Sequence, residues 1–112
     1  MLNFKEGTKK GAVKYWHAYD GDKRIGYAYI IESQDPNLGK YFLINVFMNK
    51  TSQRKGYGSQ LFSRIAILSG LNMLYAKSSK SNTGSYKAAL KAGYSEIIKH
   101  AFKQRVMIWK KN

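Results

Sequence analysis

The stretch from Asn49 to Leu61, NKTSQRKGYGSQL, places three basic residues and two glycines between two apolar segments. The segment before it, 41–48 (YFLINVFM), is almost continuously apolar, as is typical of a strand buried on both faces. The segment after it, 59–71, repeats apolar residues at helical spacing. A loop at a helix N-terminus meets unpaired backbone N–H groups and the positive end of the helix dipole. The stretch is therefore either a plain surface turn or a cradle for a phosphate or pyrophosphate.

The composition indicates one folded domain covering residues 1–112. Hydrophobic residues make up 44% of the chain, which is enough for a core, and no linker or repeat divides it. The chain has no cysteine, which excludes disulfides and Cys-based zinc sites and fits a reducing cytoplasm. The small size favours a phage or mobile element, so we expect the cytoplasm of a bacterial or phage-infected cell. Neither His17 nor His100 has the partner spacing of a metal site, so we expect no metal. No apolar run approaches the ~20 residues of a membrane span.

The charge is the most unusual property of the composition. Twenty basic residues against six acidic ones give a net charge of +14, and between Pro36 and Asn112 fourteen bases face one acid, Glu96. Such a surface attracts polyanions such as nucleic acid, phosphorylated cofactors, anionic membranes or acidic proteins. A solvated lysine surface that keeps a small protein in solution is the simpler alternative.

Periodicity and turn signals predict an α+β fold. We expect strands at 12–20, 24–33, 41–48 and 72–79, helices at 59–71 and 83–92, and a bent strand or a hairpin at 96–109. Asp20-Gly21 predicts a hairpin turn, Asn82 or Thr83 an N-cap, and Gly93 a C-cap. The result is a mixed, mostly antiparallel central sheet with two main helices, in a layering close to three-layer α/β.

The loop also matches a family pattern. Residues 53–58, QRKGYG, fit Q/R-x-x-G-x-G/A, and this resembles the pyrophosphate loop of the GNAT superfamily, the acyl-CoA-dependent N-acyltransferases. The second helix is similar too, because Asn82 and Gly93 stand eleven residues apart and Tyr94 follows. The resemblance covers roughly residues 25–98 and implies a short member in which the first strand and the helix pair after it are mostly missing.

The resemblance implies a site for acetyl-CoA or another acyl-CoA. Loop amides would hold the pyrophosphate, and the edge of residues 47–48 would pair with the pantetheine arm. The implied cofactor-binding residues are Phe47, Met48, Gln53, Arg54, Lys55, Gly56, Tyr57, Gly58, Ser59 and Asn82. A splay between 43–48 and 73–78 would admit the thioester, and a backbone N–H near Met48 would polarise its carbonyl.

The catalytic positions depart from the family. Many members carry a tyrosine as general acid seven residues after the asparagine, where this chain has Ala89, so Tyr86 is the nearest substitute. Many also place a glutamate before the loop as the base, and here Glu32 or Asp35, or a water chain ending on Asn45, would take that role.

The resemblance implies an N-acetyltransferase that acetylates an amine by direct attack on the thioester. The charge suggests an acceptor that is nucleic acid (DNA or tRNA) or bound to it, and a homodimer is left open. The alternative is a catalytically inactive GNAT-fold protein that binds nucleic acid or a protein partner. Tyrosines among lysines in the first strands favour sheet packing, or else stacking of bases beside phosphate contacts.

Overall fold

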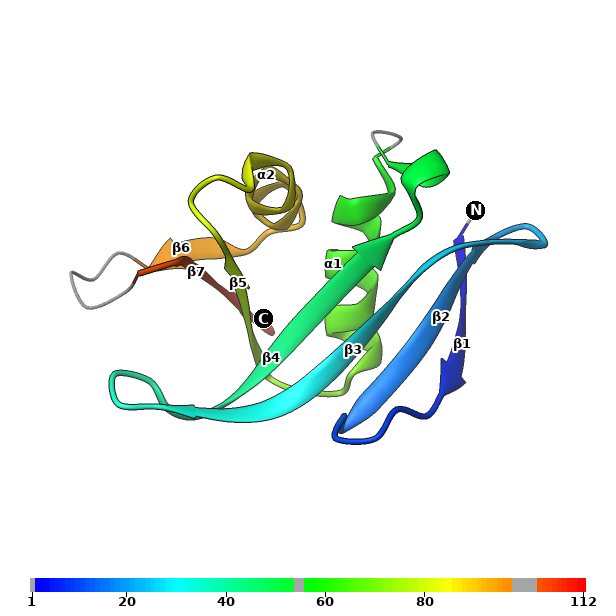
Figure 1. Ribbon diagram of the computed structural model, residues 1–112. Coiled ribbons are helices and arrows are strands. Elements are labelled where there is room, and N and C mark those ends of the chain that lie inside the picture. The colour runs from blue at the N-terminus through cyan, green and yellow to red at the C-terminus, as the bar shows by residue number, and fades with distance from the viewer. Residues whose placement is uncertain (1, 54–55, 98–102) are drawn as a thin grey trace.

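The first half of the chain forms an antiparallel meander. The computed structural model describes residues 2–53, 56–97 and 103–112 (Figure 1). The meander consists of β1 (Leu2–Gly7), β2 (Lys14–Asp20), β3 (Lys23–Asp35) and β4 (Gly39–Met48). Each strand pairs with the next along the chain, and the predicted Asp20-Gly21 turn joins β2 to β3, with Gly21 at φ 61°.

The second half crosses over through a helix and completes the sheet. It consists of the 3-10 turn η1 (Lys50–Ser52), α1 (Tyr57–Leu68), β5 (Met73–Ser78), α2 (Thr83–Lys91), β6 (Ser95–Ile97) and β7 (Arg105–Lys110). The strand order is β1-β2-β3-β4-β5-β7-β6, in which only the β4–β5 pair is parallel among the strands described. The predicted mixed, mostly antiparallel sheet with two main helices is confirmed.

One hydrophobic core joins both helices to one face of the sheet. Phe62 and Ile65 of α1 and Ala89 of α2 pack with Ile44 and Leu74 from the central strands. The Tyr94 hydroxyl, just after α2, donates to the Phe62 carbonyl of α1 at 3.0 Å. Both α-helices of the described chain therefore form one layer, and the three-layer-like arrangement expected from the sequence is not seen.

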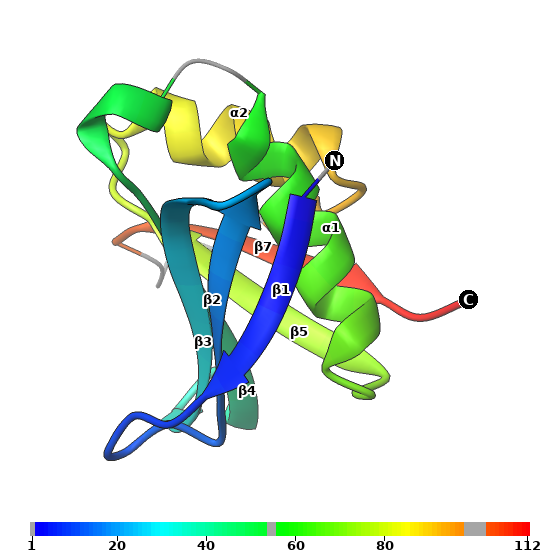
Figure 2. The ribbon, with the colours of Figure 1, turned by 90° about the vertical axis from the view of Figure 1, so that its right-hand side faces the viewer.

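The N-terminal strand corrects a second expectation. The resemblance suggested that the first strand is mostly missing, but β1 pairs along β2 from Leu2↔Asp20 to Gly7↔Tyr15. Arg64 of α1 donates to the Leu2 carbonyl at 2.7 Å, which ties the strand to the helix layer. No helix pair follows β1, because Thr8–Val13 lead directly into β2. The face of β1–β4 turned away from α1 therefore carries no α-helix of the described chain (Figure 2).

Candidate functional site

The glycine loop ends at the start of α1. Gly56 takes the left-handed conformation, with φ 78°, which favours glycine because it has no Cβ. Gly58 lies in the first turn of α1, where a Cβ would come within 3.3 Å of the Ala88 Cβ on α2. The two glycines thus allow both the sharp entry into α1 and its close approach to α2.

The two helices differ in how their first turns are capped. Asn82 caps α2, because its Oδ1 accepts a hydrogen bond from the Ser85 N–H at 3.2 Å. At α1 no side chain of the described residues caps the first turn, and that turn contains no acidic residue. The first N–H groups of a helix have no partner within it and carry the positive end of its dipole. The start of α1 is therefore the stronger candidate for binding an anion.

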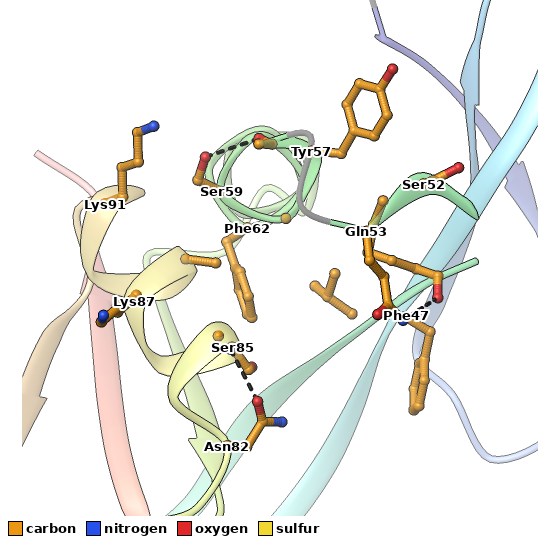
Figure 3. A pocket seen from close by; sticks show the side chains of 16 residues that line it. Phe47, Ser52, Gln53, Tyr57, Ser59, Phe62, Asn82, Ser85, Lys87 and Lys91 are labelled. Atoms are coloured by element: carbon orange, nitrogen blue, oxygen red, sulfur yellow. Dashed lines mark hydrogen bonds between the residues drawn. The ribbon is translucent and has the colours of Figure 1, made fainter. Parts of the chain in front are cut away.

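A groove of about 620 Å³ opens between the starts of α1 and α2 and the end of β4 (Figure 3). It is lined by Val46, Phe47, Met48, Ser52, Gln53, Gly56, Tyr57, Gly58, Ser59, Phe62, Asn82, Gly84, Ser85, Lys87, Ala88 and Lys91. Its charged lining residues among those described are both lysines, so the groove is electropositive. The shape and the charge fit an elongated anionic ligand.

The groove continues along an unpaired edge of β4. In the described strands, the β4–β5 register is limited to Leu43↔Tyr75, whereas β3 pairs with β4 as far as Met48. The Met48 carbonyl accepts a hydrogen bond from Gln53 Nε2 at 3.4 Å, so it points away from β3. Because the N–H and C=O of one strand residue point the same way, the Met48 N–H faces the open side too. The predicted splay between the two strands is present and leaves a backbone edge beside the groove.

Comparisons with known proteins agree with this geometry. The sequence matches the Acetyltransferase (GNAT) family over residues 2–94. The chain belongs to the GNAT acetyltransferase family. A comparison with curated proteins gives no match.

Solved GNAT structures share the fold at low sequence identity. A Bacillus subtilis acetyltransferase in complex with CoA aligns with a TM-score of 0.73 at 13% identity, with 100% of both chains covered. A putative acetyltransferase from Salmonella typhimurium with acetyl-CoA gives 0.68 at 18% identity, over 87% of this chain and 64% of that one. An aminoglycoside acetyltransferase in complex with coenzyme A aligns with a TM-score of 0.69 at 18% identity, over 91% of this chain and 68% of that one.

The GNAT loop residues fall into three groups. Gln53, Gly56, Gly58 and Ser59 line the groove, and Ser59 Oγ donates back to the Gly56 carbonyl at 3.2 Å. Arg54 and Lys55 lie outside the described residues.

Tyr57 forms the third group, because its side chain is engaged elsewhere. Its hydroxyl donates to Asp20 Oδ2 at 2.5 Å, and Figure 3 shows its ring turned away from Asn82 and Ser85. This hydrogen bond raises the pKa of Tyr57 above its ordinary value. The tyrosine anchors the start of α1 to the end of β2 and leaves its backbone to the groove.

None of the candidate catalytic side chains is among the groove-lining residues. The Tyr86 hydroxyl donates to Glu96 Oε1 at 2.8 Å, and this bond raises the pKa of Tyr86. Glu32 pairs with Lys40 at 2.5 Å and sits opposite Phe42, six residues before Met48 on β4. Asn45 stands closer to Met48 along β4, and it pairs with Tyr29 of β3. Their catalytic roles stay predictions.

The structure adds groove residues that the sequence reasoning did not select. Lys87 and Lys91 stand four residues apart on α2 and line the groove beside Ala88. Their i, i+4 spacing places them on one helical face, which was readable from the sequence. What the sequence could not show is that this face borders the groove. Among the described residues, no group of three or more His, Asp or Glu gathers as a metal site, and no helix is long and apolar enough to cross a membrane.

Proposed function

We propose that this GNAT protein is an N-acetyltransferase that binds acetyl-CoA and acetylates an amine. The observation that carries the proposal is the continuity of the site. The uncapped start of α1 opens into the groove, and the groove runs to the unpaired edge of β4 at Met48. A ligand with a pyrophosphate at one end and an extended amide-bearing arm at the other matches both parts.

The described residues offer a binding partner for each part of coenzyme A. The N–H groups of Tyr57, Gly58 and Ser59 would donate to the pyrophosphate, whose charge the helix dipole favours. Lys87 and Lys91 add positive charge on the facing helix. The open edge at Met48, next to Phe47, can hydrogen-bond the arm in the manner of an added strand. Related structures crystallised with CoA or acetyl-CoA support this assignment.

The chain itself contributes orientation and one hydrogen-bond donor. Acetyl-CoA supplies an acetyl group activated as a thioester. Its leaving group is the coenzyme A thiolate, and because a thiol has a pKa of ~8.5, it can leave near neutral pH with little help from an acid. In the proposed reaction the amine nitrogen attacks the thioester carbonyl, the C–S bond breaks, and the amine gives up a proton to solvent. The Met48 N–H would donate to the carbonyl oxygen as its charge grows. No carboxylate lines the groove among the described residues, so an amine already neutral in solution suits the site best.

The proposed acceptor is associated with nucleic acid. The net charge of +14 exceeds what one cofactor needs, and the α-helix-free face of β1–β4 leaves room for a large acceptor. Both features support an acceptor amine carried on, or held by, a polyanion.

Calorimetric titration with acetyl-CoA tests the cofactor assignment, with ATP and 3′,5′-ADP as polyanion controls. The test variant is Gly58→Glu, which puts a carboxylate where the pyrophosphate should sit. The matched control is Gln60→Glu, which adds the same charge two residues on, at an exposed position outside the groove. Because a Cβ at residue 58 approaches Ala88, Lys87→Gln provides a second variant that leaves the helix contact intact.

We expect acetyl-CoA to bind more tightly than the controls, to lose binding in Gly58→Glu, and to keep it in Gln60→Glu. Equal binding of all three nucleotides, unchanged in Gly58→Glu, would refute the cofactor site. Release of free CoA thiol with candidate amines then separates an enzyme from an inactive GNAT-fold binding protein.

A further inference from the structure

Four aromatic rings cluster on the α-helix-free face of the sheet. Tyr15 of β2 stands opposite Tyr29 of β3, and Tyr27 of β3 stands opposite Phe47 of β4. Their ring centroids are 4.9–6.4 Å apart, and their planes differ by only 11–25°. We call these four residues the platform.

The platform is not part of the core. Side chains alternate between the two faces of a strand, and Trp16 and Ala28, adjacent to the platform residues of β2 and β3, are buried against the helices. Val46, adjacent to Phe47, packs against the same core. The platform residues therefore face the other way. That face of β1–β4 carries no α-helix of the described chain (Figure 2). Phe47 is 44% exposed, and the three tyrosines are half-buried.

Basic groups surround the rings. Lys9 Nζ lies over the Tyr29 ring at 5.2 Å, and the Arg24 guanidinium lies over the Tyr27 ring at 5.3 Å. Arg24 is fixed in place, because its Nε donates to His17 Nδ1 and its Nη2 to the Tyr15 hydroxyl, each at 3.1 Å. The neighbours of the platform on the same face are Lys5, His17, Arg24, Ile31, Leu43 and Asn45, none of them a carboxylate.

We propose that the platform binds unpaired bases of a single-stranded nucleic acid. The four rings stack on one another, so a base of any sequence can extend the stack at its end or insert between two rings, and adjacent cations meet its phosphates. Lys9 is exposed, so a base can take its place over Tyr29 while the ammonium moves to a phosphate. A second copy of this chain is a poor occupant, because two chains of charge +14 repel each other. This binding does not depend on the proposed acetyl transfer.

Fluorescence anisotropy with a labelled single-stranded RNA of about twelve nucleotides tests the platform. The comparison ligands are the same sequence as DNA, a duplex, an abasic oligomer of equal length and a glutamate-rich peptide. The test variant is Tyr29→Leu, which removes the ring and keeps apolar volume. The matched control is Tyr75→Leu, another half-buried strand tyrosine, which packs edge-on against Tyr41 outside the platform. Thermal melting confirms that both variants are folded.

We expect Tyr29→Leu to weaken single-strand binding about 5- to 150-fold, from the usual contribution of one stacked base. Tyr75→Leu should bind like the parent chain. Because a tyrosine carries no charge, the salt dependence should keep its slope in Tyr29→Leu, whereas Lys9→Gln should reduce the log–log slope by about 0.7. RNA and single-stranded DNA should both bind, and a preference between them would identify the natural source of the bases.

Three results would overturn the proposal. The first is that Tyr29→Leu binds the single-stranded RNA as tightly as the parent chain does. The second is that the abasic oligomer or the duplex binds as tightly as the single strand, and the third is that the glutamate-rich peptide binds and loses its binding in Tyr29→Leu. Acetyl-CoA titration into Tyr29→Leu should give the parent affinity, so a failure at the groove and a failure at the platform are told apart.

Discussion

Gly26 of β3 is the position where one methyl group should do the most damage. A Cβ added there would lie 2.1 Å from the Phe47 carbonyl oxygen of β4, and real Cβ contacts essentially never fall below 3.0 Å. The gap must open by about 0.9 Å, and the obstructing atom is backbone, which cannot swing away like the end of a side chain. The Gly26→Ala substitution therefore has to push β3 and β4 apart at their paired ends.

The expected cost follows from two contributions. Overpacking of a tight site costs about 1–3 kcal/mol, and each weakened ladder hydrogen bond about 1 kcal/mol. A total of about 2–4 kcal/mol lowers the melting temperature by roughly 8–16 °C in a domain of this size. Because Phe47 and Met48 line the groove, acetyl-CoA affinity should fall as well.

Thermal melting followed by far-UV circular dichroism measures the effect. Gly84→Ala is the matched control, because the nearest atom to its added Cβ is Asn82 Oδ1 at 4.0 Å and alanine is the better helix former. That variant should melt at or slightly above the parent temperature. A Gly26→Ala protein that melts within about 2 °C of the parent would refute the argument from the close contact.

Three further predictions concern single side chains. Asn82→Asp keeps the cap on α2 but places a negative charge on the groove, so acetyl-CoA affinity should fall with little change in melting temperature. Asn82→Ala removes the cap and should cost about 1 kcal/mol of stability. Equal acetyl-CoA affinity in Asn82→Asp and the parent would mean that Asn82 acts only as a helix cap. Tyr57→Phe should melt below the parent by a constant margin at neutral pH, and this margin should shrink above pH 10. The hydrogen bond to Asp20 raises the pKa of Tyr57, so its contribution to stability is lost as pH rises through that raised value. Melting curves from pH 7 to about 11 measure the margin, and a margin that grows with pH would contradict the argument. Tyr86→Phe should leave the turnover number unchanged, because the Tyr86 hydroxyl is bonded to Glu96 and the residue does not line the groove; a steep loss in steady-state assays would restore Tyr86 as the general acid.

The parts of the fold that could be predicted are those with strong local signals. The run at 41–48 is β4, the apolar spacing after the loop is α1, and Asn82 and Gly93 flank α2 as its N-terminal cap and the left-handed residue after its end. The ambiguous tail resolves into a hairpin of β6 and β7. β1 was missed because its alternation is short, with two apolar residues, Leu2 and Phe4, among polar ones, and its stability comes from pairing with β2.

The candidate site divides in the same way. The spacing of Gly56 and Gly58 predicts the loop, and the cap position of Asn82 predicts its place at the start of α2. The direction in which a side chain points depends on tertiary contacts, which is why the bond from Tyr57 to Asp20 was not foreseen. The bond from Tyr86 to Glu96 on β6 was not foreseen for the same reason. Stacking of bases on tyrosines of the first strands was one of two interpretations of the sequence, but the set of rings that forms the platform could not be predicted, because they come from three strands whose register had to be known.

The contrast between the two helix starts also bears on how the protein is maintained in a cell. α2 carries its own cap, whereas the first turn of α1 has none among the described side chains. Under the proposed function an anion completes that turn, and a ligand that binds only the folded chain adds about 2.7 kcal/mol of stability at one hundred times its Kd. Protection of the α1 amides from hydrogen exchange, and survival against proteases, should then rise with the acyl-CoA concentration. The amount of this protein would follow the supply of its own substrate.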